Sequence, residues 1–215
     1  MNGIFTIPSE QYHAAAGVSN SALKWIRAPK TPLHFKARFI DKVIPDEESP
    51  ALRIGSILHR CVLEPETMAG AFYEKPDGMN FATKEGKAWK AKHNDGLPII
   101  SREDADNLIG MEAAVMCHDI AGRLITRGVS ELAAFAKDPS TGMMMKGKLD
   151  KVFEDAAGDI WIADLKKVQD ARDFARACAS FRYDLQAAYY LDLVRACGLD
   201  AKGFVFLAVE EKPPH

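Results

Sequence analysis

The chain of 215 residues has few cysteines, and none has the spacing in which cysteine usually acts. The four cysteines lie far apart and form no CxxC pair. This spacing argues against a zinc or iron–sulfur site and against a disulfide framework. It fits a reducing compartment, so we expect a cytoplasmic protein.

Long apolar runs are also missing. No stretch approaches the roughly 20 apolar residues that cross a bilayer. The opening residues, MNGIFTIPSEQYH, lack the basic-then-apolar pattern of a signal peptide, so we expect no membrane association. The phosphate-binding pattern GxxxxGK[ST] is absent too, and the sequence therefore gives no indication of ATP dependence.

Neither sign of charge dominates. The formal net charge is −2, with 28 basic and 30 acidic residues, so a surface that binds nucleic acid must be local. The hydrophobic share of 47% is that of an ordinary globular protein. No internal repeat or low-complexity tract is evident, and the length allows one large domain or two small ones.

The order of predicted elements changes near residue 128. Residues 1–128 are typical of helices and loops, whereas residues 129–215 begin with three strands. Two helices follow, around 171–180 and 183–197, and then a last strand. We predict an α/β (α+β) fold in a single domain over 1–215, with a helical front part and a catalytic part.

Capping residues mark two helices of the front part. Ser49 can cap a helix whose first turn contains Pro50, a residue suited to that position. Ser101 and Asp104 resemble a capping box at the start of a later helix.

Charged residues end an apolar strand in GDIWIADLKKV, residues 158–168. The preceding turn, DAAG, is centred near Ala157. Strand partners across it have numbers that sum to about 314, which sets Asp150 opposite Asp164. Both faces of these strands are largely apolar, as in central strands covered on both sides. Two facing carboxylates there need a cation; Lys166 could serve, but two acids suit a hard metal such as magnesium.

A surface hairpin would give the same pattern if its acids and lysines formed solvated ion pairs. A register slip of one residue would also separate the two aspartates. The pattern by itself indicates a metal site without establishing one.

Several stretches together resemble the PD-(D/E)xK nuclease superfamily. Its core is matched by KGKLD, with Asp150 as the isolated acid, and by ADLK, with Asp164 and Lys166 as the acid and lysine. The chain is more specifically similar to RecE-type (exonuclease VIII-like) exonucleases of phages and prophages. The stretches that carry this likeness follow the expected order: YHAAAGVSNSALKWIRAPKTPLHFKA, IGSILHRCVLEPE, KGKLDKV, IADLKKVQDA and YDLQAAYYLDLV. Lys167-Val168 departs from the usual DLKT.

The resemblance implies a restriction-endonuclease-like core, a mixed central sheet flanked by helices. It also implies an Mg²⁺-dependent exonuclease, with Mn²⁺ as a substitute, that degrades one strand of linear double-stranded DNA from 5′ to 3′. Relatives act as homo-oligomeric rings, tetrameric by resemblance, and pass the exposed strand to a single-strand annealing recombinase. We expect a phage or prophage protein in the bacterial cytoplasm.

Two alternatives remain open at this point. One is a related nuclease of other polarity or with an endonuclease role, because the same site can cut in either direction. The other is a non-catalytic protein that binds DNA ends. A lost site acid would favour the second alternative, and none is missing.

The resemblance also assigns roles to single residues. Asp150 and Asp164 are expected to bind magnesium, and Lys166 to orient or help deprotonate the attacking water. His59 matches the family's metal-reaching histidine, although a lone histidine on an apolar helix is usually a core residue. Glu131 begins the first strand of the catalytic part, where related nucleases often have a further ligand.

DNA contacts are expected at two places. Gln186 and Tyr190, four residues apart on one helical face, match the QxxxY element beside the active site of RecB-like nucleases. A half-buried helix with Tyr190 in the core would give the same spacing. Lys84 and Lys87 could contact phosphates, or they could belong to an ordinary solvated face.

Overall fold

The computed structural model describes residues 2–27, 29–45 and 49–215, which divide into two compact units. Unit 1 consists of the described residues of Met1–Glu47, Thr126–Asp164 and Arg172–Leu207. Unit 2 consists of those of Glu48–Ile125, Leu165–Ala171 and Ala208–His215. Each unit combines segments from distant parts of the sequence. The single domain over residues 1–215 stays a prediction.

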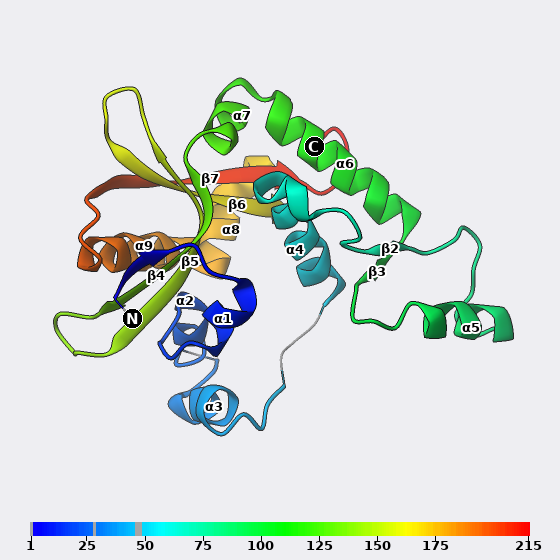
Figure 1. Cartoon of the computed structure of the whole chain (residues 1–215), viewed down its shortest axis with the longest axis horizontal. Helices are drawn as coiled ribbons and strands as arrows, with labels where there is room; N and C mark the ends of the chain where they lie inside the picture. The colour runs from blue at the N-terminus through cyan, green and yellow to red at the C-terminus, as the bar shows by residue number, and fades with distance from the viewer. Residues whose placement is uncertain (1, 28, 46–48) are drawn as a thin grey trace. The chain divides into compact units, whose positions relative to one another are not determined.

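A five-stranded mixed sheet, in the order β1-β4-β5-β6-β7, contributes most of its residues to unit 1 (Figure 1). Its strands are β1 (Gly3–Phe5), β4 (Val129–Lys137), β5 (Met144–Glu154), β6 (Ile160–Val168) and β7 (Ala201–Glu210). Neighbouring strands from β1 to β6 are antiparallel. The predicted α/β class with a mixed central sheet is confirmed.

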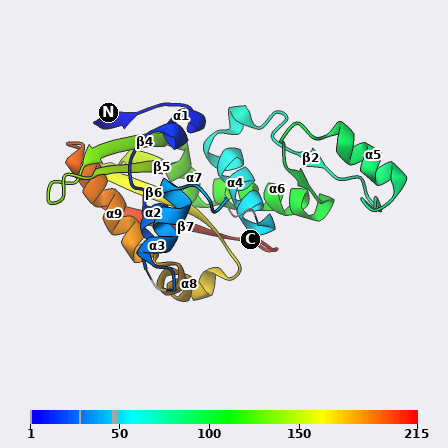
Figure 2. The ribbon, with the colours of Figure 1, turned by 90° about the horizontal axis from the view of Figure 1, so that it is seen from below.

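Helices cover both faces of this sheet. Successive residues of a strand point to opposite faces, and β4 shows this directly. Phe135 packs with Tyr12 of α1 (Ser9–Ala14), whereas Ala134 belongs to the cluster that contains Leu193 of α9 (Tyr183–Ala196). Figure 2 shows α1 and α9 on opposite sides of the strands. The central strands are therefore covered on both sides, as their apolar sequences predicted.

The remaining helices of unit 1 lie in two segments. After β6, the 3₁₀ turn Ala171–Asp173 leads into α8 (Phe174–Phe181) and α9 (Tyr183–Ala196), which connect β6 to β7. Near the N-terminus are α2 (Asn20–Leu23), α3 (Pro32–Phe35) and a π-helical turn (Lys36–Ile40). The stretch through α8 and α9, between the neighbouring strands β6 and β7, is a helical crossover of the kind that a parallel pair requires.

Unit 2 is mainly helical. Its elements are α4 (Pro50–Leu63), a 3₁₀ turn (Pro65–Thr67), β2 (Tyr73–Glu74), α5 (Lys84–Lys92), β3 (Ile99–Ile100), α6 (Arg102–Cys117) and α7 (Asp119–Thr126). Leu58 of α4 and Met111 of α6 are fully buried in its core. Among the described residues, no helix has both the length and the apolar character needed to cross a membrane.

Both predicted helix starts are confirmed. The Ser49 side chain accepts a hydrogen bond from the Leu52 N–H at 3.2 Å, and Pro50 occupies the first turn of α4. Ser101 and Asp104 form a full capping box at α6. These caps satisfy backbone donors that would otherwise lack partners at the start of each helix.

Candidate metal centre

Two carboxylates face each other across the β4–β5 ladder of unit 1. Ser130 pairs with Lys151, so the next residues along the two strands, Glu131 and Asp150, are opposite each other. A carboxylate oxygen of Glu131 and one of Asp150 lie within 4.8 Å of each other. Both side chains are half-buried, so their charges are only partly screened by water.

A third carboxylate continues the row on β6. Ala163 pairs with Lys151, and the same register carried one residue further sets Asp164 opposite Asp150. The turn between the strands is closed by hydrogen bonds between the backbones of Asp155 and Asp159, around Ala157. The register predicted from the sequence is thus confirmed. Asp164 is buried, with 2% of its surface exposed.

Glu131 has an unusual backbone and a close cation. Its φ of 57° lies in the left-handed region, which costs a residue with a side chain about 1–2 kcal/mol. Its carboxylate forms an ion pair with Lys148, which lies two residues before Asp150 on β5. Lys148 Nζ also donates a hydrogen bond to Ser9 Oγ at 2.7 Å. Because strand residues alternate between faces, Lys148 lies on the same face of β5 as Asp150.

Helix α9 brings an amide and a phenol to the acids. Gln186 Nε2 donates a hydrogen bond to Asp164 Oδ1 at 2.5 Å, and both side chains are buried. Burial, with the negative charges of Asp164 and Asp150, raises the pKa of Tyr190 well above its ordinary value. The phenol therefore stays protonated at neutral pH and can act as a hydrogen-bond donor. The structure brings both QxxxY residues to the aspartates.

The approach of α9 depends on a glycine in KGKLD. A β-carbon at Gly147 would lie 2.7 Å from Leu193 Cδ2 and 3.0 Å from Tyr190 Cε1. Only a residue without a side chain lets the helix pack this closely on β5. Sequence reasoning missed this role, although the position of Gly147 in the motif was a usable signal.

His59 lies on α4 in unit 2, where its ring contacts the backbone of β6. Its Nε2 donates to the Leu165 carbonyl oxygen at 2.9 Å. Because a carbonyl only accepts, Nε2 carries the proton, and the neutral ring has its lone pair on Nδ1. This is the arrangement found in metal-ligating histidines, whose other ring nitrogen donates to a fixed acceptor. Leu165 directly follows Asp164 in the chain.

The two lysines at the end of β6 differ in their surroundings. Lys166 is half-buried and lies two residues after Asp164, hence on the same side of the strand. Lys167 forms an ion pair with Glu211, with Nζ 2.5 Å from Oε2. Where the usual pattern DLKT has threonine, this chain has Lys167, and that lysine is paired with an acid within unit 2.

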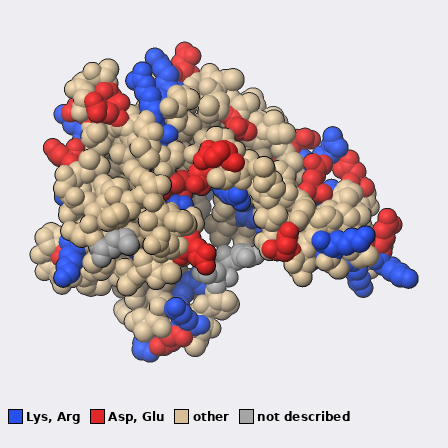
Figure 3. Space-filling view, viewed as in Figure 1, with Lys and Arg blue, Asp and Glu red and all other residues tan. Residues whose placement is uncertain are grey.

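The predicted phosphate-binding lysines lie on α5. Lys84 and Lys87 are both exposed on this helix, which Thr83 caps. Trp89 anchors the helix by stacking on Phe81, with ring centroids 6.0 Å apart. Basic and acidic side chains stand together over this part of unit 2 in Figure 3. The surface at α5 is thus locally basic without being purely cationic.

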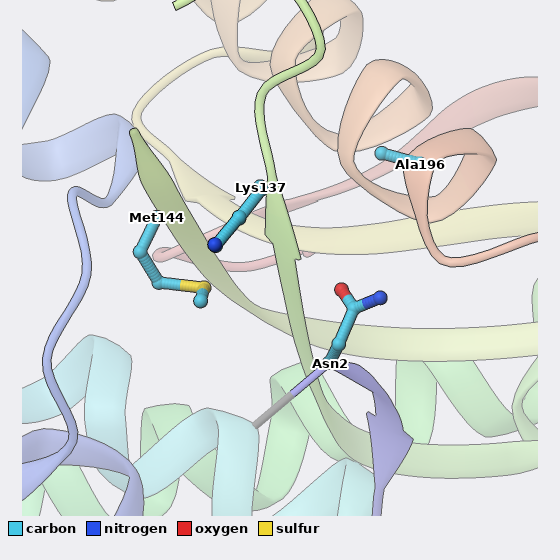
Figure 4. Close-up of a pocket in the computed structure, with 4 residues that line it drawn as sticks. All are labelled: Asn2, Lys137, Met144 and Ala196. Atoms are coloured by element: carbon cyan, nitrogen blue, oxygen red, sulfur yellow. The ribbon is translucent and has the colours of Figure 1, made fainter. Parts of the chain in front are cut away.

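A surface pocket of about 400 Å³ in unit 1 is separate from the carboxylates. It is lined by Asn2, Lys137, Met144 and Ala196 (Figure 4). Lys137 pairs with Met144 at one end of the β4–β5 ladder, whereas the acids lie toward the other end. None of the predicted site residues lines this pocket.

Comparison with known families gives a match over most of the chain. A family model described as a PDDEXK-like domain of unknown function (DUF3799) matches residues 19–215. The matched range includes every residue predicted for the site, and it excludes β1 and α1. No curated protein matches the chain.

Proposed function

Because the chain belongs to this PDDEXK-like family, we propose that it is a metal-dependent exonuclease that degrades one strand of linear duplex DNA. The PDDEXK-like domain indicates a nuclease, and such nucleases generally use divalent metals. One observation carries the proposal: Glu131, Asp150 and Asp164 form a row on three neighbouring strands. Like charges this close are unfavourable unless a cation joins them.

The donor set fits a hard divalent cation. Carboxylate oxygens are the ligands that Mg²⁺ prefers, and Mn²⁺ accepts the same ligands. Glu131 and Asp150 would each give an oxygen, since these lie within 4.8 Å of each other. Asp164 is proposed to give a third because the strand register sets it opposite Asp150. When bound, the ion supplies a nucleophilic water near neutral pH and stabilises charge on the phosphate.

His59 is proposed as the nitrogen ligand. Its hydrogen bond to the Leu165 carbonyl fixes the ring one residue after Asp164 in the chain. The same hydrogen bond leaves Nδ1 unprotonated, which is the form in which a histidine nitrogen binds a metal. This role rests on the tautomer that the Leu165 carbonyl imposes and on the likeness of IGSILHRCVLEPE to RecE-type exonucleases.

Lys166 is proposed to orient the attacking water and to neutralise charge that develops on the scissile phosphate. It shares one side of β6 with Asp164, so its ammonium can reach the same phosphate. A half-buried ammonium acts more strongly than a fully solvated one, because fewer waters screen its charge.

Two residues of α9 are proposed to act at the site: Gln186 contacts Asp164, and Tyr190 contacts the DNA. Gln186 holds Asp164 in one orientation through its amide, as outer hydrogen-bond partners of ligands do. Tyr190 keeps its proton, so its hydroxyl can donate to a phosphate oxygen of the strand being cut.

The proposal extends to the DNA and to partner proteins. Lys84 and Lys87, exposed on α5, are proposed to contact phosphates outside the site. We further propose digestion from 5′ to 3′, a ring of subunits, and transfer of the exposed strand to a single-strand annealing recombinase. The lysine contacts rest on the exposure and charge of these side chains, and the other three points rest on the likeness to RecE-type exonucleases.

The deciding experiment uses linear duplex DNA labelled separately at its 5′ and 3′ ends. Wild type, Asp164→Asn and Asp150→Asn are compared in Mg²⁺, in Mn²⁺ and in chelator. We expect label release by wild type in metal only, beginning at 5′ ends, and none by either variant. Solution mass, measured in parallel, tests the ring.

Other outcomes select the alternatives. Cleavage of closed circular DNA at the same rate would show an endonuclease and reject the exonuclease. Release beginning at 3′ ends would reverse the polarity. Binding to DNA ends without any cleavage in metal would leave a non-catalytic protein and reject the enzyme.

A further inference from the structure

The N-terminal strand and helix lie outside the family match, yet two lysines attach that helix to the strand of the candidate metal centre. Lys146 Nζ donates to carbonyls at the end of α1, including that of Ala15 at 2.7 Å. Lys148 Nζ donates to Ser9 Oγ, at the start of the same helix. The two lysines of KGKLD thus hold α1 at both ends, and within the described part of the chain one of them also contacts an acid.

That lysine is Lys148, whose second partner is Glu131. The two side chains are 20% and 15% exposed, so their attraction is only partly screened. Glu131 faces Asp150, and two carboxylates at this separation repel each other unless a positive charge offsets them. The ammonium of Lys148 supplies that charge from within the chain.

A divalent cation bound by Glu131 and Asp150 would need the same carboxylate. It would also experience repulsion from an ammonium a few ångströms away. Lys148 has a second acceptor in place, since Ser9 Oγ already lies at 2.7 Å. The ammonium can therefore release Glu131 without losing all of its hydrogen bonds.

We propose that Lys148 is the internal counter-ion of the metal centre: its ammonium neutralises Glu131 in the metal-free protein, yields that carboxylate to the incoming cation and keeps Ser9. This inference rests on the proposed metal role of Glu131 and Asp150. Lys148 is a positioning residue, because it acts through Glu131 and not on the DNA.

The test measures Mn²⁺ binding to the whole chain without DNA, by electron paramagnetic resonance of the free ion. Lys148→Met removes the competing charge, so the dissociation constant should fall about tenfold. Ser9→Ala removes the alternative acceptor, so Lys148 stays on Glu131 and the constant should rise about threefold. Lys146→Met is the matched control: it removes the same charge from the same strand but leaves Glu131 paired, and the constant should stay within about twofold.

The outcomes separate this inference from the proposed function. Wild type that binds no Mn²⁺ would overturn the proposed metal site and this inference with it. Wild type that binds Mn²⁺, with an unchanged or weaker constant for Lys148→Met, would overturn the counter-ion role alone. If Lys148→Met does not fold, as judged by its thermal transition, Ser9→Ala decides, and an unchanged or tighter constant overturns the role.

Discussion

Gln186 donates a hydrogen bond from Nε2 to Oδ1 of Asp164 across 2.5 Å, between two side chains that are both buried. The bond links α9 to the acid within β6. It fixes one oxygen of Asp164, which helps to hold the carboxylate in a single orientation.

Gln186→Leu should therefore reduce cleavage about 10- to 100-fold, the usual effect of losing an outer partner of a metal ligand. Single-turnover cleavage of end-labelled DNA checks this, with exposed Gln11→Leu as the control. A rate equal to that of wild type would show that the amide only fills space.

Lys166→Met should reduce the cleavage rate about 100-fold or more, because a charge that stabilises the transition state is lost. Lys167→Met is the matched control on the same strand, since Lys167 is paired with Glu211. DNA binding in chelator should change little for either variant. Equal losses of rate in both variants would contradict a specific role for Lys166.

Gly147→Ala should destabilise the fold by about 1–3 kcal/mol, the usual cost of overpacking. The new methyl group would meet Leu193 Cδ2 at 2.7 Å. Gly55→Ala in α4 is the control: a β-carbon there would meet nothing within 4 Å, and alanine should stabilise that helix by about 0.5–1 kcal/mol. Urea denaturation measures both. Unchanged stability of Gly147→Ala would mean that α9 shifts freely on β5.

Lys84→Ala with Lys87→Ala should weaken DNA binding and lower the slope of log K against log salt by about two. Fluorescence anisotropy in chelator measures this without cleavage. Lys202→Ala with Lys212→Ala removes the same charge elsewhere and serves as the control. The same slope for the α5 variant and wild type would exclude phosphate contacts at α5.

Stability should fall at high pH partly through Tyr12. Burial raises the pKa of Tyr12 to about 12 from an ordinary value of 10.0. Between these values the unfolded chain releases the phenol proton while the folded chain keeps it, so the free energy of unfolding decreases as pH rises. Tyr12→Phe should reduce that decrease by about 1.4 kcal/mol per pH unit. Urea denaturation from about pH 9 to about pH 11 tests this, and parallel curves for variant and wild type would contradict it.

Local signals predicted much of the fold. The helix starting at Pro50 follows from the cap at Ser49, because a hydroxyl there satisfies a backbone donor of the first turn. The hairpin register follows from a short turn, which leaves few ways to pair the strands, and Lys151 opposite Ala163 confirms it. Both features depend on residues that are close in sequence.

Features that depend on distant partners were not predicted. The pairing of β1 with β4 joins segments about 130 residues apart, and three residues are too few for a periodic pattern. The left-handed backbone of Glu131 has no sequence signal, because glutamate does not favour it. The contact between Lys148 and Ser9 likewise requires the sheet and α1 to be in place.

The roles of the candidate residues stay predictions. Strand alternation and register explain why the three acids form a row, and α9 explains why Gln186 and Tyr190 lie near them. Catalysis, ion identity, strand polarity and oligomeric state depend on groups beyond this chain, so they await the experiments above.

The left-handed φ at residue 131 favours glycine for stability, whereas the proposed metal site requires the glutamate side chain. Glycine would relax that peptide and delete the proposed ligand in a single step, since it alone adopts positive φ at little cost. A selection for heat resistance without a screen for cutting would therefore favour glycine there and yield robust but inert protein. Libraries built on this scaffold should keep residue 131 fixed.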